Sequence, residues 1–183
     1  MMLRLSCILF TLGLWSLSAQ AQVITQISTL WDDRVDQWVI YTDNEDLEGL
    51  IELRWPLRED LSEWKYELDE LSGIIKQTWK GNPNSWEVIP YDGPRIIAKT
   101  IWQNDFSEWK ITQGNKIYRF KSKYPSQRFE WELSKGKQDE FYIYMINEAD
   151  PRDWSVEDYI EDGSLDLSIA MSFVAIYNSL PRN

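Results

Sequence analysis

The chain contains no histidine, and its only cysteine is Cys7. The absence of histidine excludes a Ser-His-Asp triad, a histidine general base and a histidine metal cage. A lone cysteine forms neither an internal disulfide nor a cysteine zinc site. Any chemistry would have to use carboxylates, lysine, hydroxyl groups or tyrosine, and the sequence predicts no cofactor and no metal ion.

Basic residues are also scarce. The 183 residues include 19 Lys and Arg against 30 Asp and Glu, which gives a formal net charge of −11. DNA and RNA backbones attract basic proteins, so we expect no nucleic-acid partner for this acidic chain. Aromatic residues are plentiful by contrast, with 11 Trp, 9 Tyr and 6 Phe. These large side chains are the obvious material for a core.

Residues 1–21 have the pattern of a secretory signal peptide. Arg4 supplies the positive charge, residues 5–17 form an apolar run, and residues 19–21 (Ala-Gln-Ala) form a small-residue cleavage site. The run is too short for a transmembrane anchor, which needs about 20 apolar residues. We therefore expect cleavage after this triplet and export to the periplasm or the medium. The mature chain, residues 22–183, is expected to form a single domain without cysteine.

Tryptophan recurs about every 23 residues in the mature chain. The six positions are Trp38, Trp64, Trp86, Trp109, Trp131 and Trp154. Another aromatic residue stands seven positions before most of them, as Trp79 stands before Trp86, and polar, turn-rich segments lie between. Each unit predicts a strand ending in an aromatic residue, a loop, a strand beginning with Trp, and a turn. Six such units predict a meander of about twelve strands.

Apolar and polar residues alternate along these strands, which is typical of a sheet with one buried face. The inner face is predicted to include Ile51, Leu53, Trp55, Trp64, Tyr66 and Leu68, and the outer face Glu52, Arg54, Lys65 and Glu67. A long meander leaves unpaired edges unless it closes on itself. The sequence therefore predicts a mainly β fold, an antiparallel barrel of about twelve strands with its aromatic face inward.

An apolar helix is predicted over residues 165–180. Ser164 is the expected N-cap, and Pro181 would stop the helix. A helix that is apolar on nearly every side is buried rather than amphipathic, so we expect it to fill the barrel, with Met171 and Phe173 in the core. The alternative, a membrane span, is disfavoured because the segment is short and contains several Ser and an Asn.

A twelve-strand meander followed by an apolar helix resembles the Tubby C-terminal-like superfamily, which includes the LURP-one-related proteins and the phospholipid scramblases. Residues 166–176, DLSIAMSFVAI, are similar to the central helix of the LURP-one-related proteins, and residues 99–112, KTIWQNDFSEWKIT, to their aromatic hairpins. The resemblance implies a barrel and a binding or membrane-associated protein rather than an enzyme. The export signal is a departure, because most relatives are intracellular.

Carboxylates suggest two other kinds of site. Residues 43–46, Asp-Asn-Glu-Asp, look like part of a calcium loop but lack the EF-hand order, and a solvated turn is the favoured interpretation. The pairs Asp105/Glu108 and Asp150/Asp153 have the residue types of a glycosidase site, but loop carboxylates this frequent pair by chance. We predict no catalytic residue. Trp31 and Trp55, at the first loop junctions, are the tryptophans to test for exposure, because exposed rings stack on sugars or lipid headgroups.

Positive charge is concentrated in residues 95–137, which hold ten basic and four acidic side chains, a net charge of +6. The candidate anion-binding residues are Lys99, Lys110, Arg119, Lys121 and Lys123. Alternation places the last three on one outer face, with Lys110 on the next strand and Lys99 one strand further. Two of the four acids, Asp105 and Glu108, are expected in a loop. The alternative is ordinary solvated lysine on exposed strands.

These features together predict an exported, non-enzymatic binding protein of the cell envelope that recognises an anionic lipid, glycan or protein surface. The main alternative is a structural or interaction protein with no small ligand, which would use the acidic loops. A carboxylate-based hydrolase is the third interpretation. A deep pocket with two close carboxylates would favour the hydrolase, whereas a basic wall around a sealed core would favour binding.

The first testable prediction concerns export. N-terminal sequencing of the protein isolated from its native envelope should start at Gln22, because signal peptidase cuts after small-residue triplets of this kind. Cell fractionation should place the protein outside the cytoplasm. An intact Met1 on a cytoplasmic protein would contradict the prediction.

Overall fold

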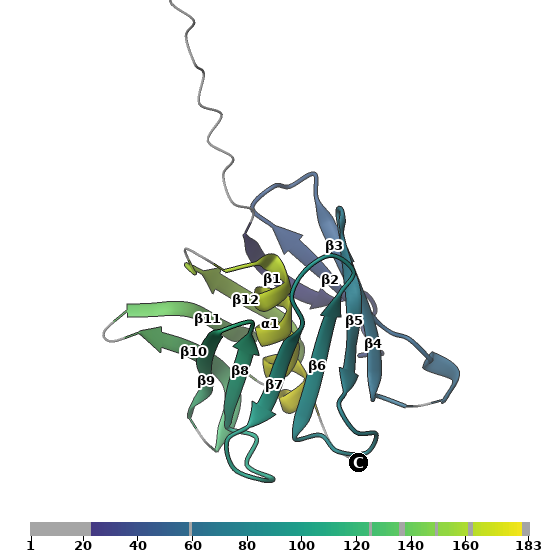
Figure 1. Ribbon diagram of the computed structural model, residues 1–183. Coiled ribbons are helices and arrows are strands. Elements are labelled where there is room, and N and C mark those ends of the chain that lie inside the picture. Colours follow the sequence, from purple (N-terminus) through teal and green to yellow (C-terminus); the bar gives the residue numbers. More distant parts are fainter. Residues whose placement is uncertain are drawn as a thin grey trace, which may run out of the picture.

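The computed structural model describes residues 23–58, 60–124, 126–135, 138–148, 150–160 and 163–180. The predicted signal peptide and its cleavage site lie outside this part of the chain. Within it, twelve antiparallel strands form a closed barrel around one helix, α1 (Leu165–Ser179) (Figure 1). The predicted mainly β barrel with a C-terminal helix is confirmed.

The strands follow one another around the barrel in chain order. They are β1 (Ile24–Thr29), β2 (Gln37–Thr42), β3 (Glu48–Leu53), β4 (Glu63–Leu68), β5 (Leu71–Gln77), β6 (Ser85–Pro90), β7 (Ile96–Thr100), β8 (Glu108–Gln113), β9 (Lys116–Tyr124), β10 (Gln127–Lys135), β11 (Gln138–Asn147) and β12 (Asp150–Asp158). A short 3₁₀ helix, η1 (Pro56–Arg58), follows β3. β1 pairs with β12, with Ile27 opposite Trp154, and this pairing removes both sheet edges.

Because the strands run alternately up and down, the segments that follow β1, β3, β5, β7, β9 and β11 all lie at one end of the barrel. We call it the aromatic end, since these are the segments with the paired aromatic residues. The C-terminal part of α1 lies at the same end, where Arg128 at the start of β10 donates to the Asn178 carbonyl oxygen at 3.4 Å.

The six recurring tryptophans form a ring in the core, and each is at most 2% exposed. Every indole N–H donates to the backbone carbonyl oxygen three residues earlier, over distances from 2.7 Å at Trp154 to 3.2 Å at Trp86. A buried indole N–H needs an acceptor, and the preceding loop supplies it in each repeat. The bond therefore fixes each loop to the strand that it enters.

Trp55 does not lie on the inner face, as the alternation predicted. β3 ends at Leu53, so the period-2 pattern stops before this residue, and Trp55 is 42% exposed. Its indole N–H donates to Glu63 Oε2 at 3.0 Å, and the Arg54 guanidinium lies 5.2 Å from its ring centre. These polar partners hold the ring outside the barrel.

Helix α1 fills the barrel as predicted. The Ser164 hydroxyl accepts from the Leu167 N–H at 3.2 Å, which caps the first turn. Met171 and Phe173 are both buried, and Phe173 packs edge-on against Trp64 and Trp86, with ring centres 5.6 and 4.9 Å apart. In the part of the chain that the structure describes, no helix has both the length and the apolar character needed to span a membrane.

The second prediction follows from this packing. Met171→Asp places an unpaired charge in an apolar interior, at a cost of several kcal/mol against a typical total stability of about 5–15 kcal/mol. We expect the variant to unfold or to melt far below the wild type in a circular dichroism scan. Leu57→Asp is the matched control, because Leu57 is fully exposed. A Met171→Asp melting curve like that of the wild type would show that α1 does not support the barrel.

Candidate functional site

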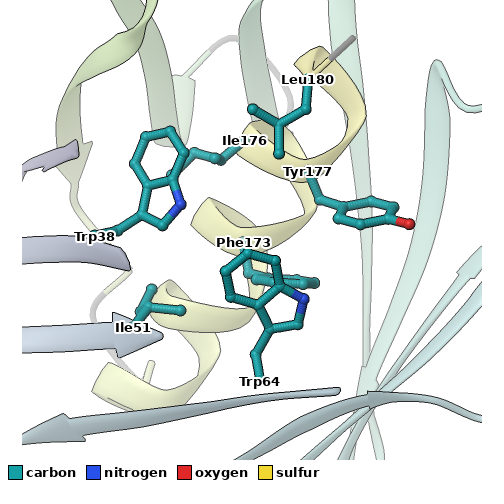
Figure 2. Close-up of a pocket in the computed structure, with 7 residues that line it drawn as sticks. All are labelled: Trp38, Ile51, Trp64, Phe173, Ile176, Tyr177 and Leu180. Atoms are coloured by element: carbon teal, nitrogen blue, oxygen red, sulfur yellow. The ribbon is translucent and has the colours of Figure 1, made fainter. Parts of the chain in front are cut away.

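The barrel interior is closely packed between α1 and strands β2–β4. The space between the helix and β2–β4 is lined by Trp38, Ile51, Trp64, Phe173, Ile176, Tyr177 and Leu180 (Figure 2). Only about 10 Å³ there is open to the centre of a water molecule, which is room for about one water. This space is too small for a ligand, so no binding site lies between the helix and these strands.

A buried polar contact joins α1 to the wall. The Tyr66 hydroxyl donates to Asp166 Oδ1 at 2.5 Å, and the Asp166 side chain is almost completely buried. Burial raises the pKa of the Asp166 carboxyl above its ordinary value, and burial together with the Asp166 hydrogen bond raises the pKa of Tyr66. Gly73 makes room for the ring, because a Cβ there would lie 2.6 Å from Tyr66 Cζ. Sequence reasoning missed this contact, since its residues are 100 positions apart.

One carboxylate of each pair considered for a hydrolase, Asp105 and Asp150, has a partner of its own. Asp105 accepts hydrogen bonds from the Ser107 hydroxyl and backbone N–H, and these bonds lower the pKa of its carboxyl. Asp150 binds the Arg152 guanidinium at 2.5 Å, which likewise lowers the pKa of Asp150. A glycosidase general acid needs a raised pKa. Neither carboxyl is set up for that role.

Residues 43–46 form an exposed turn between β2 and β3. Asp43 Oδ1 accepts from the Val23 N–H at 3.0 Å, and Asn44 Oδ1 accepts from the Asp46 N–H at 3.2 Å. The segment therefore uses its side chains to shape the turn. In the described residues there is no group of three or more potential ligand side chains that could hold a metal ion.

The five candidate cations lie on the exposed outer face of β7, β8 and β9. Lys99 lies directly opposite Lys110, and Lys110 directly opposite Arg119. These three residues form a cationic row across three neighbouring strands. Lys121 and Lys123 follow Arg119 along β9.

Acidic residues neutralise part of this wall. Lys121 binds Glu132 and Lys123 binds Glu130, each at 3.0 Å, and Arg119 forms an ion pair with Glu108. Glu108 does not lie in a loop as predicted: it is the first residue of β8, so its carboxylate lies on the sheet. Three of the five candidate cations are therefore paired with a carboxylate, and the least neutralised part of the outer face lies at the other two.

Lys99 and Lys110 are the two members of the row without a carboxylate partner among the described residues. Like charges directly opposite each other repel and destabilise a sheet. An anion bound over the two ammonium groups would relieve this repulsion, so the pair attracts anions. Lys99 is also close to the aromatic end, because its partner on β6, Ser85, is the first residue of that strand.

Five aromatic residues are exposed around the aromatic end. They are Trp31 (52%), Trp55 (42%), Trp79 (73%), Trp102 (67%) and Tyr124 (44%). The indoles of Trp31 and Trp55 donate to Gln37 and Glu63, respectively. Among the described residues, the indoles of Trp79 and Trp102 have no such partner. The sequence analysis singled out Trp31 and Trp55 as tryptophans to test for exposure, but it did not expect Trp79, Trp102 and Tyr124 outside the core.

A cleft lies beside the loop that carries Trp79 and is lined by Gln103, but not Trp102, from the loop after β7. We call it the rim cleft, and its lining residues are Trp79, Asn82, Asn84, Ser85, Lys99, Thr100 and Gln103. Its volume is about 300 Å³, at the lower end of the range for small-molecule sites. Lys99 thus belongs both to the cationic row and to a hollow lined by amides, hydroxyls and an indole.

No family model, no curated protein and no solved structure matches this chain. The resemblance to the Tubby C-terminal-like superfamily stays a prediction. Function has to be inferred from the geometry of the chain itself.

The third prediction concerns pH and the buried carboxyls. Burial raises the pKa of Asp158 and Asp166, so the folded chain keeps their protons at pH values where the unfolded chain has lost them. The resulting stability is present below the ordinary pKa near 3.8 and is lost as pH rises through the raised pKa. We expect Asp166→Asn to flatten the fall in unfolding free energy with rising pH, measured by urea titration.

Asp153→Asn is the control for this experiment, because Asp153 is exposed on the same barrel. It removes the same formal charge as Asp166→Asn, so it separates the loss of a charge from the loss of the buried carboxyl. Parallel curves for the wild type and Asp166→Asn would contradict the prediction.

Proposed function

We propose that this chain is an exported, non-enzymatic binding protein of the cell envelope that recognises an anionic surface or polymer. We also propose that it belongs to the Tubby C-terminal-like superfamily, a proposal that the barrel and its central helix support. The observation that carries the function is the cationic row, in which Lys99 and Lys110 face each other without a carboxylate partner in the described residues.

The distribution of charge supports this function. The chain as a whole is strongly acidic, whereas residues 95–137 have a net charge of +6. A local positive wall on an acidic protein attracts anions to one face and leaves the other faces repulsive. This arrangement favours binding of an anionic partner at one face and disfavours non-specific binding of anions to the rest of the protein.

The packing of α1 against β2–β4 also supports binding at the surface. The space between the helix and these strands, near Trp38, holds about one water. The groups available to a partner are therefore those on the outer wall and at the aromatic end.

The fourth prediction tests the cationic row. At low salt, wild-type protein should bind an anionic surface or polymer. The measurements are sedimentation with anionic vesicles, with neutral vesicles as the comparison, and retention by an acidic polymer. Retention should be lost near 1 M salt, where the Debye length is about 3 Å. Lys99→Gln with Lys110→Gln should weaken binding strongly, because it removes the charges that lack carboxylate partners.

Lys121→Gln with Lys123→Gln is the matched control, since it changes the net charge equally but removes lysines that are already paired with Glu132 and Glu130. The control should bind more tightly than the Lys99 and Lys110 variant. Retention of that variant at the wild-type level would leave the row as ordinary solvated surface and overturn the proposed function.

A further inference from the structure

We propose that the rim cleft is a saccharide-binding site and that the anionic partner of this protein is an acidic polysaccharide. Trp79 and Trp102 would stack on sugar faces, the amide side chains would hydrogen-bond to hydroxyl groups, and Lys99 would bind a carboxylate or sulfate of the chain. The proposal rests on the proposed function, because Lys99 belongs to both the row and the cleft.

The cleft is held in shape before any ligand arrives. The Asn84 side-chain oxygen accepts from the Asn104 N–H at 2.7 Å and from the Thr100 hydroxyl at 3.2 Å. The Asn84 amide nitrogen donates to Asn82 Oδ1 at 3.0 Å and to Asn104 Oδ1 at 3.3 Å. One side chain therefore ties both loops together, which lowers the entropy that binding would otherwise cost.

Several polar groups in the cleft remain available. Lys99 and Gln103 form no side-chain hydrogen bond with another described residue, and the Asn82 amide nitrogen has no acceptor among them. A sugar hydroxyl both donates and accepts hydrogen bonds, and a side-chain amide offers both a donor and an acceptor to it. An ammonium group beside them adds selectivity for a charged sugar.

The loops that carry the two free indoles are neighbours at the aromatic end. Trp79 follows β5 and lines the cleft, and Trp102 follows β7, next to the lining residue Gln103, so the strands that lead into their loops are about 10 Å apart at the usual spacing. We propose that Trp79 contacts a sugar in the cleft and that Trp102 contacts a sugar further along the chain. Trp79 and Trp102 are also the two most exposed tryptophans among the described residues, so most of each ring is open to a partner.

A lipid bilayer is the other partner that exposed tryptophans suggest, and the observations favour a sugar. The rim cleft is hollow and lined mainly by amides and hydroxyls, whereas a bilayer needs a projecting apolar surface.

The experiment measures the affinity of the mature chain for three acidic polysaccharides (polygalacturonate, alginate and hyaluronate), for polyphosphate and for anionic vesicles. Trp79→Ala with Trp102→Ala should bind at least one of the polysaccharides about tenfold or more weakly than the wild type, a loss of about 1.4 kcal/mol. Its affinity for polyphosphate should be unchanged, because polyphosphate offers charge but no sugar face. Trp31→Ala is the matched control, since Trp31 is exposed on the opposite side of the barrel.

The outcomes separate the two proposals. Lys99→Gln with Lys110→Gln should weaken both polysaccharide and polyphosphate binding. If that variant loses binding while the Trp79 and Trp102 variant keeps full polysaccharide affinity, the saccharide site is refuted and the proposed function stands. If the wild type binds no polysaccharide, or the tryptophan variant loses only vesicle binding, the saccharide site is also refuted. Unchanged binding by the lysine variant refutes the proposed function. Circular dichroism confirms that each variant is folded.

Discussion

A twelve-stranded barrel encloses more space than the side chains of its own wall readily fill, and this protein depends on closing that space. Six buried tryptophans line the wall, and α1 occupies the axis between them. Phe173 connects the two layers through edge-on contacts with Trp64 and Trp86. Because this packing leaves no room for a ligand between α1 and β2–β4, the proposed recognition lies on the outer wall and at the aromatic end.

The repeat unit links this core to the surface. In each unit the second aromatic residue enters the core, and its indole bonds to the carbonyl three residues earlier, which closes the loop. The first aromatic residue stands at the strand end and is left outside, as Trp79 and Trp102 are. One sequence pattern thus produces both a rigid interior and an exposed aromatic rim. The rigidity of the core keeps the rim loops in fixed positions, which is the condition for a preorganised site.

On the outer wall, the pairing of charges depends on which residues lie opposite each other on neighbouring strands. Cross-strand neighbours decide which lysines are neutralised, and Glu130 and Glu132 from β10 bind Lys123 and Lys121. Lys99 and Lys110 lie further from that strand and face each other instead. The wall therefore combines a neutralised part, which is ordinary stable sheet surface, with a smaller cationic part next to the rim cleft.

The sequence by itself determined the barrel, its strand number and the buried helix, because alternation, tryptophan spacing and an apolar segment are local patterns that each correspond to one structure. Only the tertiary structure decided which cations have a carboxylate partner, since ion pairs such as Arg119–Glu108 depend on register between strands. The same holds for the Tyr66–Asp166 contact and for the rim cleft, which brings Trp79 beside Gln103 from a separate loop. Local sequence patterns determine whether a segment forms a strand or a helix. Which side chains come into contact depends on how distant segments pack, and that is decided only in the folded structure.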